Sequence, residues 1–461
     1  MSPLWTSDEI AAATGGNPSG FFEVRGVTFD SREVQPGDLF VAMPGTAYDG
    51  HRFVDGAFAA GAAAAIVAQP VSGPHILVDD TFAALRQLGR ASRERSRATI
   101  FGVTGSVGKT STKEALYAAL DRNRPGKVHR SVKSYNNHTG VPLSLARMPR
   151  DSDFAIFEMG MNNAGEIRAL TAQVRPHVAL ITAIAPAHIE NLGSEEAIAD
   201  AKAEIFESLE PHGVAIVPND TRHRDRLVKA ARRYAERIIT FGTGDADVHA
   251  VHAVNAEGGG SLISAELLER ELTFTISQHG DHWVSNSLAV LAAVEAVGAD
   301  VGRAGLALAD LSGLKGRGER HVIAIEGGAL LLIDESYNAN PASMAATLKS
   351  LGQERDVDRR IAVLGPMREL GEHSEAMHAG LAPAVVSAGI DQLVLIGPEM
   401  RPLERALAGR SGTVLVESVE QATETLRRIV RPGDAVLVKA SNSVGLAKLV
   451  ESMAKELACS T

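Results

Sequence analysis

The chain has 461 residues, of which 45% are hydrophobic and 22% charged, and its formal net charge is −10 at pH 7. This length exceeds what one hydrophobic core supports, so about three domains are expected, and the composition is that of a globular protein. The acidic balance argues against nucleic-acid binding, which needs a basic face, although a local cluster of cations and helix N-termini can still bind an anionic substrate.

The N-terminal stretch predicts a helix rather than a targeting signal. In MSPLWTSDEIAAATGG, Thr6 and Glu9 have the spacing of a capping box, and Gly15 and Gly16 end the helix. The stretch lacks a basic region followed by a long apolar run, so we expect no signal peptide.

The apolar run at 57–68 is too short and too rich in alanine to span a bilayer. With one cysteine there is no disulfide framework, and we expect a cytoplasmic protein without membrane insertion.

Three segments follow one another along the chain. Residues 1–95 alternate short strands and helices, and the charged stretch GRASRERSRA at 89–98 predicts a domain boundary. Residues 96–314 alternate apolar strands with helices and end in an antiparallel addition, which indicates a mostly parallel sheet. A second linker, GLKGRGERH at 313–321, leads to residues 315–461, whose strands and helices predict a Rossmann-like doubly wound unit. The expected fold class is α/β with three domains.

A glycine-rich turn between a predicted strand and a predicted helix carries the strongest chemical signal. The stretch FGVTGSVGKTSTK, residues 101–113, departs from the strict P-loop spacing because Val103 stands where the first glycine is expected. Backbone N–H groups and the helix N-terminus can nevertheless face a phosphate, and Lys109 adds a cation. The hydroxyl of Thr110 can coordinate Mg²⁺. We therefore predict a nucleoside triphosphate site here rather than a structural glycine turn.

Two side chains are predicted to leave apolar strands at the carboxyl edge of the same sheet, where open α/β sheets bind ligands. Glu158 ends the strand FAIFE, and His188 follows the strand VALITAI. An exposed strand-end glutamate and a structural histidine are the alternatives, but beside the glycine turn both become candidate Mg²⁺ ligands. Lys202, in SEEAIADAKAEIFE, reads by spacing alone as a solvated surface lysine. If its helix returns to this edge, its neutral amine can react with CO₂ to give a carbamate, an anion with two oxygens for a metal.

Two polar loops complete the pattern. SVKSYNNHTGVPLS is too polar for a core, and DESYNANPASM follows the first predicted strand of the C-terminal unit, with Pro341 at a helix start. Both stretches can be simple turns, yet loops at strand ends are the usual location of binding groups.

The glycine turn alone permits a kinase, a switch, a motor or a ligase. The chain has no Asn-Lys-x-Asp guanine signature, and no acidic pair closes its second strand. A nucleotide domain between two other α/β domains suits a reaction of ATP with two further substrates. ATP can convert a carboxylate into an acyl phosphate, which an amine then attacks. Two metal ions and Lys109 would offset charge on the transferring phosphoryl group, and domain closure would exclude water.

Taken together, the motifs resemble those of the Mur ligases, the amide-forming enzymes of bacterial peptidoglycan synthesis, over nearly the whole chain. FDSREVQPGDLFVAMPG is similar to their uridine-nucleotide domain. TGSVGKTSTKE, NNHTGVPLS, EMGMNNAGEI and AHIENLGSEEAIADAKAEI are similar to their central ATPase domain. SYNANP, VLGPMRELGEHS and VLVKAS resemble their C-terminal domain, and SYNANP together with EMG…GEI favours the dipeptide-adding member of the family.

The resemblance implies an ATP-dependent ligase that joins D-alanyl-D-alanine to a UDP-N-acetylmuramoyl-tripeptide through an acyl phosphate, releasing ADP and phosphate. Residues 1–95 would bind the UDP-sugar, residues 96–314 would form the P-loop ATPase domain, and residues 315–461 would form the C-terminal Rossmann-like domain. The implied cofactors are ATP, two Mg²⁺ ions and a carbamylated Lys202, and we expect a monomer. Another Mur ligase or a folylpolyglutamate synthetase is the alternative within the class. A P-loop ATPase switch that binds a protein partner is the alternative outside it.

The resemblance also assigns roles by position. The residues implied in ATP binding are Thr104, Gly105, Ser106, Val107, Gly108, Lys109, Thr110, Ser111, His282, Asn286 and Arg320. Those implied in substrate binding are Asp30, Ser31, Arg32, Asn136, Asn137, Thr139, Tyr337, Asn338 and Asn340, the last three in a loop that closes over the active site. Lys109, Glu158, His188 and Lys202 would be catalytic, with Thr110, Glu158, His188 and the Lys202 carbamate serving the Mg²⁺ sites. Pro366, Ala440 and Asn442 replace the residues common in the family and weaken assignments in the C-terminal domain.

Overall fold

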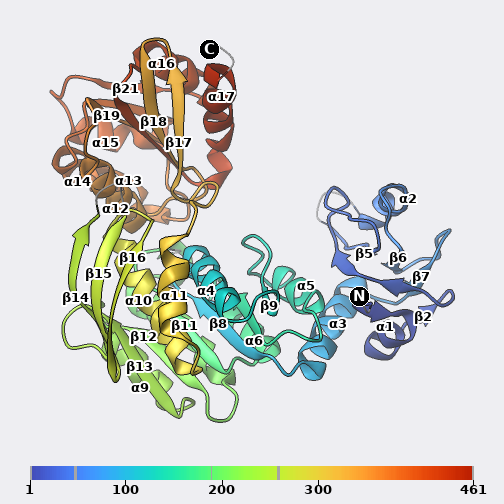
Figure 1. Cartoon of the computed structure of the whole chain (residues 1–461). Helices are drawn as coiled ribbons and strands as arrows, with labels where there is room; N and C mark the ends of the chain where they lie inside the picture. Colours follow the sequence, from blue (N-terminus) through green and yellow to red (C-terminus); the bar gives the residue numbers. More distant parts are fainter. Residues whose placement is uncertain (1–2, 46–48, 188, 257–259, 459–461) are drawn as a thin grey trace.

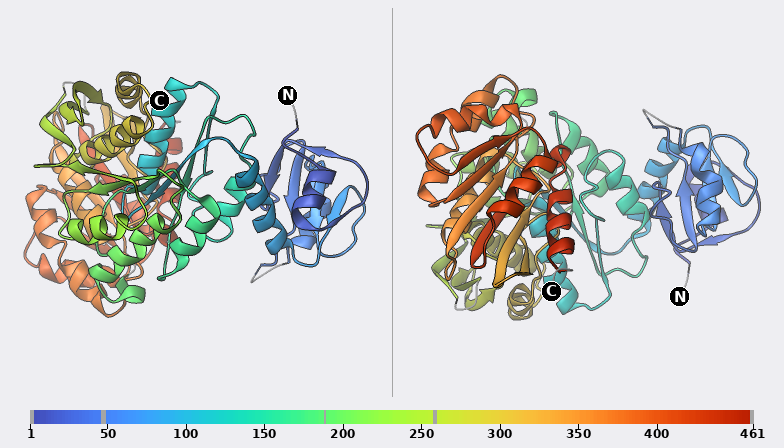
Figure 2. Two further views of the ribbon diagram at one scale, coloured as in Figure 1. Left: turned by 90° about the horizontal axis from the view of Figure 1, so that it is seen from below. Right: turned by 90° about the horizontal axis from the view of Figure 1, so that it is seen from above.

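The structure, a computed structural model, describes residues 3–45, 49–187, 189–256 and 260–458. Figure 1 shows an N-terminal α/β unit, a large central unit built on a long sheet, and a C-terminal α/β unit against one end of the central unit. In both views of Figure 2 the N-terminal unit stands to one side of the other two. Among the described residues, no helix is both long and apolar enough to cross a bilayer.

The N-terminal unit is a small sheet between helices. Its strands are ordered β2-β7-β6-β5-β4; β4, β5, β6 and β7 are parallel and β2 is antiparallel, while β1 and β3 form a separate pair. The predicted capping box is confirmed: Thr6 Oγ1 accepts the N–H of Glu9, and the Glu9 carboxylate accepts the N–H of Thr6. The elements are β1 (Trp5–Thr6), α1 (Ser7–Thr14), β2 (Asn17–Pro18), β3 (Glu23–Val24), β4 (Gly26–Thr28), β5 (Asp38–Val41), α2 (Val54–Ala59), β6 (Ala64–Val67), β7 (His75–Leu77) and α3 (Thr81–Arg95).

Residues 89–95, which predict a boundary by their charge, are the last turns of α3 rather than a loop. One of these charged residues, Arg93, is buried and contacts the central unit. Its guanidinium donates to the carbonyls of Val174 and Arg175 at 2.7 and 2.8 Å and to Glu210 at 3.1 Å. A charged helix end therefore attaches α3 to the central unit. The division of the chain at residues 95 and 314 stays a prediction.

The central unit contains one long sheet, ordered β16-β15-β14-β13-β12-β11-β8-β10-β9 within the described residues. Across the sheet, neighbouring strands from β9 at one edge through β10, β8, β11, β12 and β13 to β14 are parallel. Strands β15 and β16 pair antiparallel and are the expected antiparallel addition. Buried apolar clusters cover both faces, as continuous apolar strands of a parallel sheet require. The elements are β8 (Thr99–Thr104), α4 (Lys109–Asn123), β9 (Val128–Arg130), α5 (Gly140–Ala146), β10 (Phe154–Glu158), α6 (Glu166–Val174), β11 (Val178–Ile181), α7 (Ile189–Leu192), α8 (Glu195–Ala203), β12 (Val214–Pro218), α9 (Arg224–Ala231), β13 (Arg237–Gly242), β14 (Val248–Asn255), β15 (Ser261–Leu267), β16 (Arg270–Ile276), α10 (Asp281–Ala296) and α11 (Val301–Ala309).

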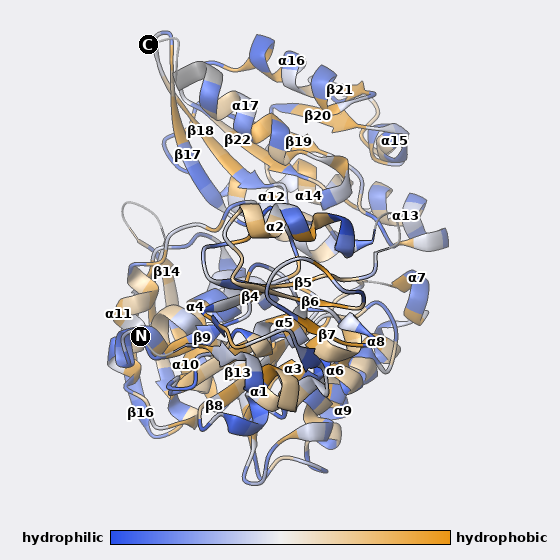
Figure 3. Cartoon of the chain, turned by 90° about the vertical axis from the view of Figure 1, so that its right-hand side faces the viewer, coloured by the Kyte–Doolittle hydropathy of each residue, from blue (hydrophilic) through white to orange (hydrophobic). Residues whose placement is uncertain are grey.

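The C-terminal unit is a doubly wound sheet ordered β17-β18-β22-β19-β20-β21, with an apolar cluster on each face. Figure 3 shows strand β20 of this sheet as largely hydrophobic. The sheet begins with an antiparallel edge strand that the sequence did not predict, so the SYNANP loop follows the second strand and not the first. The elements are β17 (Glu319–Ile325), β18 (Gly328–Glu335), α12 (Pro341–Gly352), β19 (Arg359–Leu364), α13 (Ser374–Ala379), α14 (Ala382–Ser387), β20 (Gln392–Ile396), α15 (Arg401–Ala406), β21 (Thr413–Val416), α16 (Val419–Ile429), β22 (Asp434–Lys439) and α17 (Ala447–Ala458).

A histidine in the central sheet predicts acid sensitivity. His129 Nε2 donates to the carbonyl of Ser144 at 2.7 Å, and burial lowers the pKa of His129 to about 4. Below its ordinary pKa of 6.5 the unfolded chain therefore binds a proton that the folded chain does not, so the free energy of unfolding falls as the pH falls from 6.5 to about 4.

We expect His129→Gln, which keeps a donor for Ser144, to remove roughly 2–3 kcal/mol of this pH-dependent loss. Thermal unfolding between pH 7 and pH 4 measures it, with the exposed His252→Gln as the control. An unchanged pH dependence in His129→Gln would contradict the prediction.

Candidate functional site

The glycine turn connects β8 to α4 and is held against the segment that follows β11. Gly105 has φ +151°, and a Cβ there would lie 1.9 Å from Thr182 Oγ1, so only glycine fits. Ser106 donates its N–H to the carbonyl of Ala183 at 2.8 Å and its hydroxyl to that of Ala185 at 2.9 Å. Lys109 Nζ donates to the carbonyl of Gly105 at 2.7 Å, which places the ammonium over the turn. The turn is therefore a rigid cradle at a helix N-terminus, the arrangement that binds phosphate.

Glu158 lies beside this cradle because β10 pairs in parallel with β8, with Glu158 opposite Val103. Its carboxylate is buried and accepts hydrogen bonds from Thr110 Oγ1 at 2.9 Å and Asn136 Nδ2 at 2.8 Å. Burial lowers the pKa of Lys109, and the charge of Glu158 opposes that shift. A hydroxyl and a carboxylate oxygen next to a phosphate cradle are ligands that Mg²⁺ prefers. His188 lies outside the described residues.

Lys202 is not the solvated lysine that its spacing suggests. Its residue is 1% exposed on α8, and within the described chain we find no hydrogen bond or ion pair that involves its ammonium. Burial, and then the positive charge of Lys109, lower the pKa of Lys202 well below its usual value. The helix does return toward the cradle, and both influences favour the neutral amine, the form that reacts with CO₂.

A cavity of about 560 Å³ lies between the central and C-terminal units, where Figure 1 shows α12 above α10. Two buried polar atoms beside it, Asn286 Nδ2 and His282 Nδ1, have no hydrogen-bond partner in the described part of the chain. The predicted site residues that line the cavity are Ser106, Val107, Gly108, Lys109, Ser111, Asn136, Asn137, Glu158, His282, Asn286, Tyr337, Asn338 and Asn340. The cavity thus receives side chains from both units, and two unpartnered polar atoms beside it remain to be satisfied.

Arg317 and Lys439 also line this cavity, although neither was predicted as a site residue. The Arg317 guanidinium stacks 4.1 Å from the Tyr337 ring centre, and Lys439 Nζ donates to the carbonyl of Asn338 at 2.9 Å. The predicted Arg320 instead forms a two-pronged ion pair with Glu354 at 2.7 and 2.8 Å, on a smaller cavity of about 30 Å³. The sequence held a feature that could have indicated each of these two residues. Arg317 lies between two glycines of the linker, and Lys439 ends an apolar strand as Glu158 does.

The predicted uridine-nucleotide residues belong to the N-terminal unit and do not line this cavity. Arg32 pairs with Asp30 at 2.6 and 2.8 Å, and Ser31 lies between them, half-buried. In the loop facing that unit, Asn137 Oδ1 accepts from the hydroxyl of Thr139 at 2.9 Å, which fixes the start of α5.

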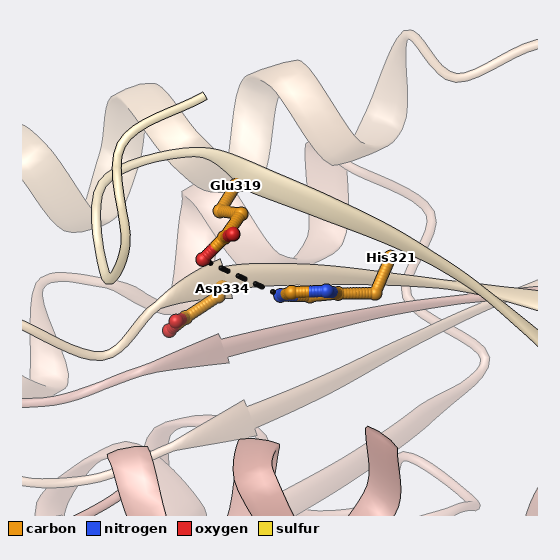
Figure 4. A group of neighbouring side chains, drawn as sticks. All are labelled: Glu319, His321 and Asp334. Atoms are coloured by element: carbon orange, nitrogen blue, oxygen red, sulfur yellow. Dashed lines mark ion pairs between the residues drawn. The ribbon is translucent and has the colours of Figure 1, made fainter. Parts of the chain in front are cut away.

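Figure 4 shows a cluster of Glu319 and His321 from β17 with Asp334 from β18, whose possible ligand atoms lie within 4.8 Å of one another. His321 Nε2 is 3.6 Å from Glu319. Each oxygen of the buried Asp334 already accepts a backbone N–H, from Gly316 at 2.9 Å and from Ser336 at 3.0 Å. This carboxylate therefore anchors the linker that carries Arg317 to the loop that carries Tyr337.

A phosphate cradle at the carboxyl edge of a parallel sheet, facing a second α/β unit across a cavity, defines a P-loop nucleotide-binding protein. Comparison with known proteins is more specific. Residues 23–93 match the Mur ligase family catalytic domain, residues 103–294 the Mur ligase middle domain, and residues 316–442 the Mur ligase glutamate ligase domain. The chain is 36% identical over 451 residues to the UDP-N-acetylmuramoyl-tripeptide–D-alanyl-D-alanine ligase of Synechocystis, covering 95% of this chain and 94% of that one.

Solved structures agree with the sequence comparison. MurF from Acinetobacter baumannii superposes with a TM-score of 0.84 at 29% identity, covering 98% of this chain and 99% of that one. MurF ligase from Thermotoga maritima in complex with ADP superposes with a TM-score of 0.78 at 29% identity, covering 95% of this chain and 99% of that one. The chain belongs to the Mur ligase family, which confirms the predicted resemblance and the α/β fold class.

Proposed function

We propose that this chain is the ligase that uses ATP to join D-alanyl-D-alanine to UDP-N-acetylmuramoyl-tripeptide in peptidoglycan precursor synthesis, within the cytoplasm and as a monomer. The observation that carries this proposal is the cavity of about 560 Å³, which side chains of the phosphate cradle and of the SYNANP loop line from opposite units. Phosphoryl transfer to one substrate and attack by a second need both reactants in one enclosed space. The name and 36% identity of the Synechocystis relative support the same reaction.

The cradle gives ATP a defined orientation in this proposal. The backbone of Gly105–Gly108 and the start of α4 would hold the phosphates, and Lys109 would lie on the γ-phosphoryl group that moves to the tripeptide carboxylate. The donors of Asn286 and His282 would contact the base, since both hold a buried nitrogen without a partner among the described residues. Arg317 would add a second cation from the linker.

Thr110 and Glu158 would hold Mg²⁺, with His188 and the Lys202 carbamate completing the sites as the family resemblance implies. When bound, Mg²⁺ supplies charge neutralisation for the phosphoryl group. The chain's own part is to aim the Glu158 carboxylate at the cradle, through the hydrogen bonds from Thr110 and Asn136. The buried amine of Lys202 would add to CO₂ and release one proton, leaving an anion.

Attack by the dipeptide amine on the acyl phosphate would complete the reaction and release phosphate. Tyr337, Asn338 and Asn340 would enclose the reacting groups from the C-terminal unit and exclude water. Asp30, Ser31 and Arg32 would hold the uridine end in the N-terminal unit, with Asn137 and Thr139 on the path between the two.

An assay of phosphate release tests the function directly. We expect release from ATP to require UDP-N-acetylmuramoyl-tripeptide and D-alanyl-D-alanine together, because neither the acyl donor nor the amine alone completes a turnover. Release with the dipeptide replaced by a free amino acid would indicate a sibling ligase. Release from ATP with neither substrate would indicate a switch.

A further inference from the structure

One short loop of the central unit contacts both other units. We call residues 131–136, between β9 and α5, the junction loop. Toward the N-terminal unit, Lys133 forms an ion pair with Glu33, and the Tyr135 hydroxyl donates to the same carboxylate at 3.2 Å. The loop therefore lies close to the predicted uridine-nucleotide residues 30–32.

The other side of the junction loop reaches the cradle and the linker. Ser134 Oγ accepts a hydrogen bond from Arg317 at 3.3 Å and lies 3.2 Å from Thr110 Oγ1. Asn136 donates to Glu158 at 2.8 Å. Any displacement of this loop therefore moves the partners of the carboxylate and of the hydroxyl that are proposed to hold Mg²⁺.

A buried lysine that the proposed mechanism does not use holds this loop in place. Lys113, on α4, has a side chain that is 0% exposed, and its Nζ donates to the carbonyls of Ser131 at 3.0 Å and Lys133 at 2.5 Å. The same ammonium lies 3.8 Å from Glu158 and 3.0 Å from Glu114. One cation thus fixes the loop backbone and balances the charge of Glu158.

The conformation of the loop shows why it needs such a support. Lys133 has φ +52°, a left-handed conformation that is unfavourable for a residue with a side chain. The hydrogen bond from Lys113 to the Lys133 carbonyl holds the peptide unit that this conformation orients. Without this hydrogen bond, Lys133 could leave the left-handed conformation. That change would move Tyr135 relative to Glu33 and Ser134 relative to Arg317.

We propose that Lys113 is a positioning residue whose hold on the junction loop couples occupancy of the N-terminal unit to nucleotide binding at the cradle. The proposal rests on the proposed function in taking the N-terminal unit as the uridine-nucleotide site. Contacts that run without a gap from Glu33 through the loop to Thr110 and Glu158 are the physical route. Coupling between two binding equilibria is reciprocal, so it is measurable from either side.

The test measures the dissociation constant of the magnesium complex of adenylyl imidodiphosphate by calorimetry, with and without saturating UDP-N-acetylmuramoyl-tripeptide. For the wild-type protein we expect the second ligand to change this constant at least about fivefold, the lower end of common coupling strengths. For Lys113→Met we expect the ratio to fall to within about twofold of unity. The control Lys127→Met removes an exposed lysine paired with Asp151 and should keep the wild-type ratio.

A ratio in Lys113→Met equal to that of the wild type would overturn the proposal, and so would a wild-type ratio of one. Glu33→Gln is a second variant that removes the negative charge of the ion pair with Lys133 and leaves the buried lysine intact, and it should lower the ratio in the same way. It decides the question if Lys113→Met does not fold. A wild-type protein that binds neither ligand overturns the proposed function, whereas one that binds both ligands independently overturns only this inference.

Discussion

Replacement of Lys109 by methionine is expected to lower the rate of phosphate release by a factor of about 10³. Its ammonium lies over the glycine turn, 2.7 Å from the Gly105 carbonyl, at the N-terminus of α4. In a site closed to water, one positioned cation stabilises the charge that develops on the phosphoryl group far more than it stabilises ground-state ATP. Methionine keeps the length of the side chain and removes only the charge and the donor.

The effect of Lys109→Met should fall on turnover rather than on folding. Initial rates at saturating substrates measure turnover, and thermal unfolding should stay close to that of the wild type. The matched control is Lys229→Met, which removes an exposed lysine from α9 and should keep the wild-type rate. A loss of less than about tenfold in Lys109→Met would show that this lysine does not act on the transferring group.

The local sequence was sufficient to predict those parts of the site whose position a single strand or turn determines. An acid at the end of an apolar strand predicts a position at the carboxyl edge of a parallel sheet, and Glu158 lies there, bonded to Thr110. The glycine turn is equally local, because Gly105 is required by the approach of Thr182. The α/β class followed from the same alternation of apolar strands and helices.

The parts that sequence missed depend on packing between distant segments. Strand β17 has only one buried residue in seven, because it is an edge strand with one side toward solvent, so its hydrophobic signal is weak. The choice between Arg317 and Arg320 depends on Glu354, a partner 34 residues further along the chain that pairs with Arg320 and holds it away from the main cavity. The sequence singled out the polar stretch that contains the junction loop but not the support of that loop, because Lys113 is an ordinary lysine in a helical sequence until the fold buries it.

Loss of the Lys202 amine is expected to abolish nearly all activity, with a fall of at least about 10² in Lys202→Ala. An unmodified ammonium at Lys202 would repel Mg²⁺ and the ammonium of Lys109 and so oppose metal binding. A carbamate instead supplies two oxygens that carry negative charge. Burial and Lys109 both lower the pKa of Lys202, which favours the neutral amine that reacts with CO₂. Depletion of CO₂ and bicarbonate should therefore lower the wild-type rate, and bicarbonate should restore it.

Chemical complementation separates a carbamate from a merely structural lysine. The space vacated in Lys202→Ala is buried, so formate or acetate can supply the missing carboxylate, and we expect partial recovery of phosphate release with either anion but not with chloride. After equilibration with ¹³C-labelled bicarbonate, the wild-type protein should show a carbamate carbon resonance that Lys202→Ala lacks. Full activity in Lys202→Ala, or a wild-type rate indifferent to CO₂ with no such resonance, would instead make Lys202 a neutral packing residue, and the metal ligands would then have to come from Thr110, Glu158 and their neighbours alone.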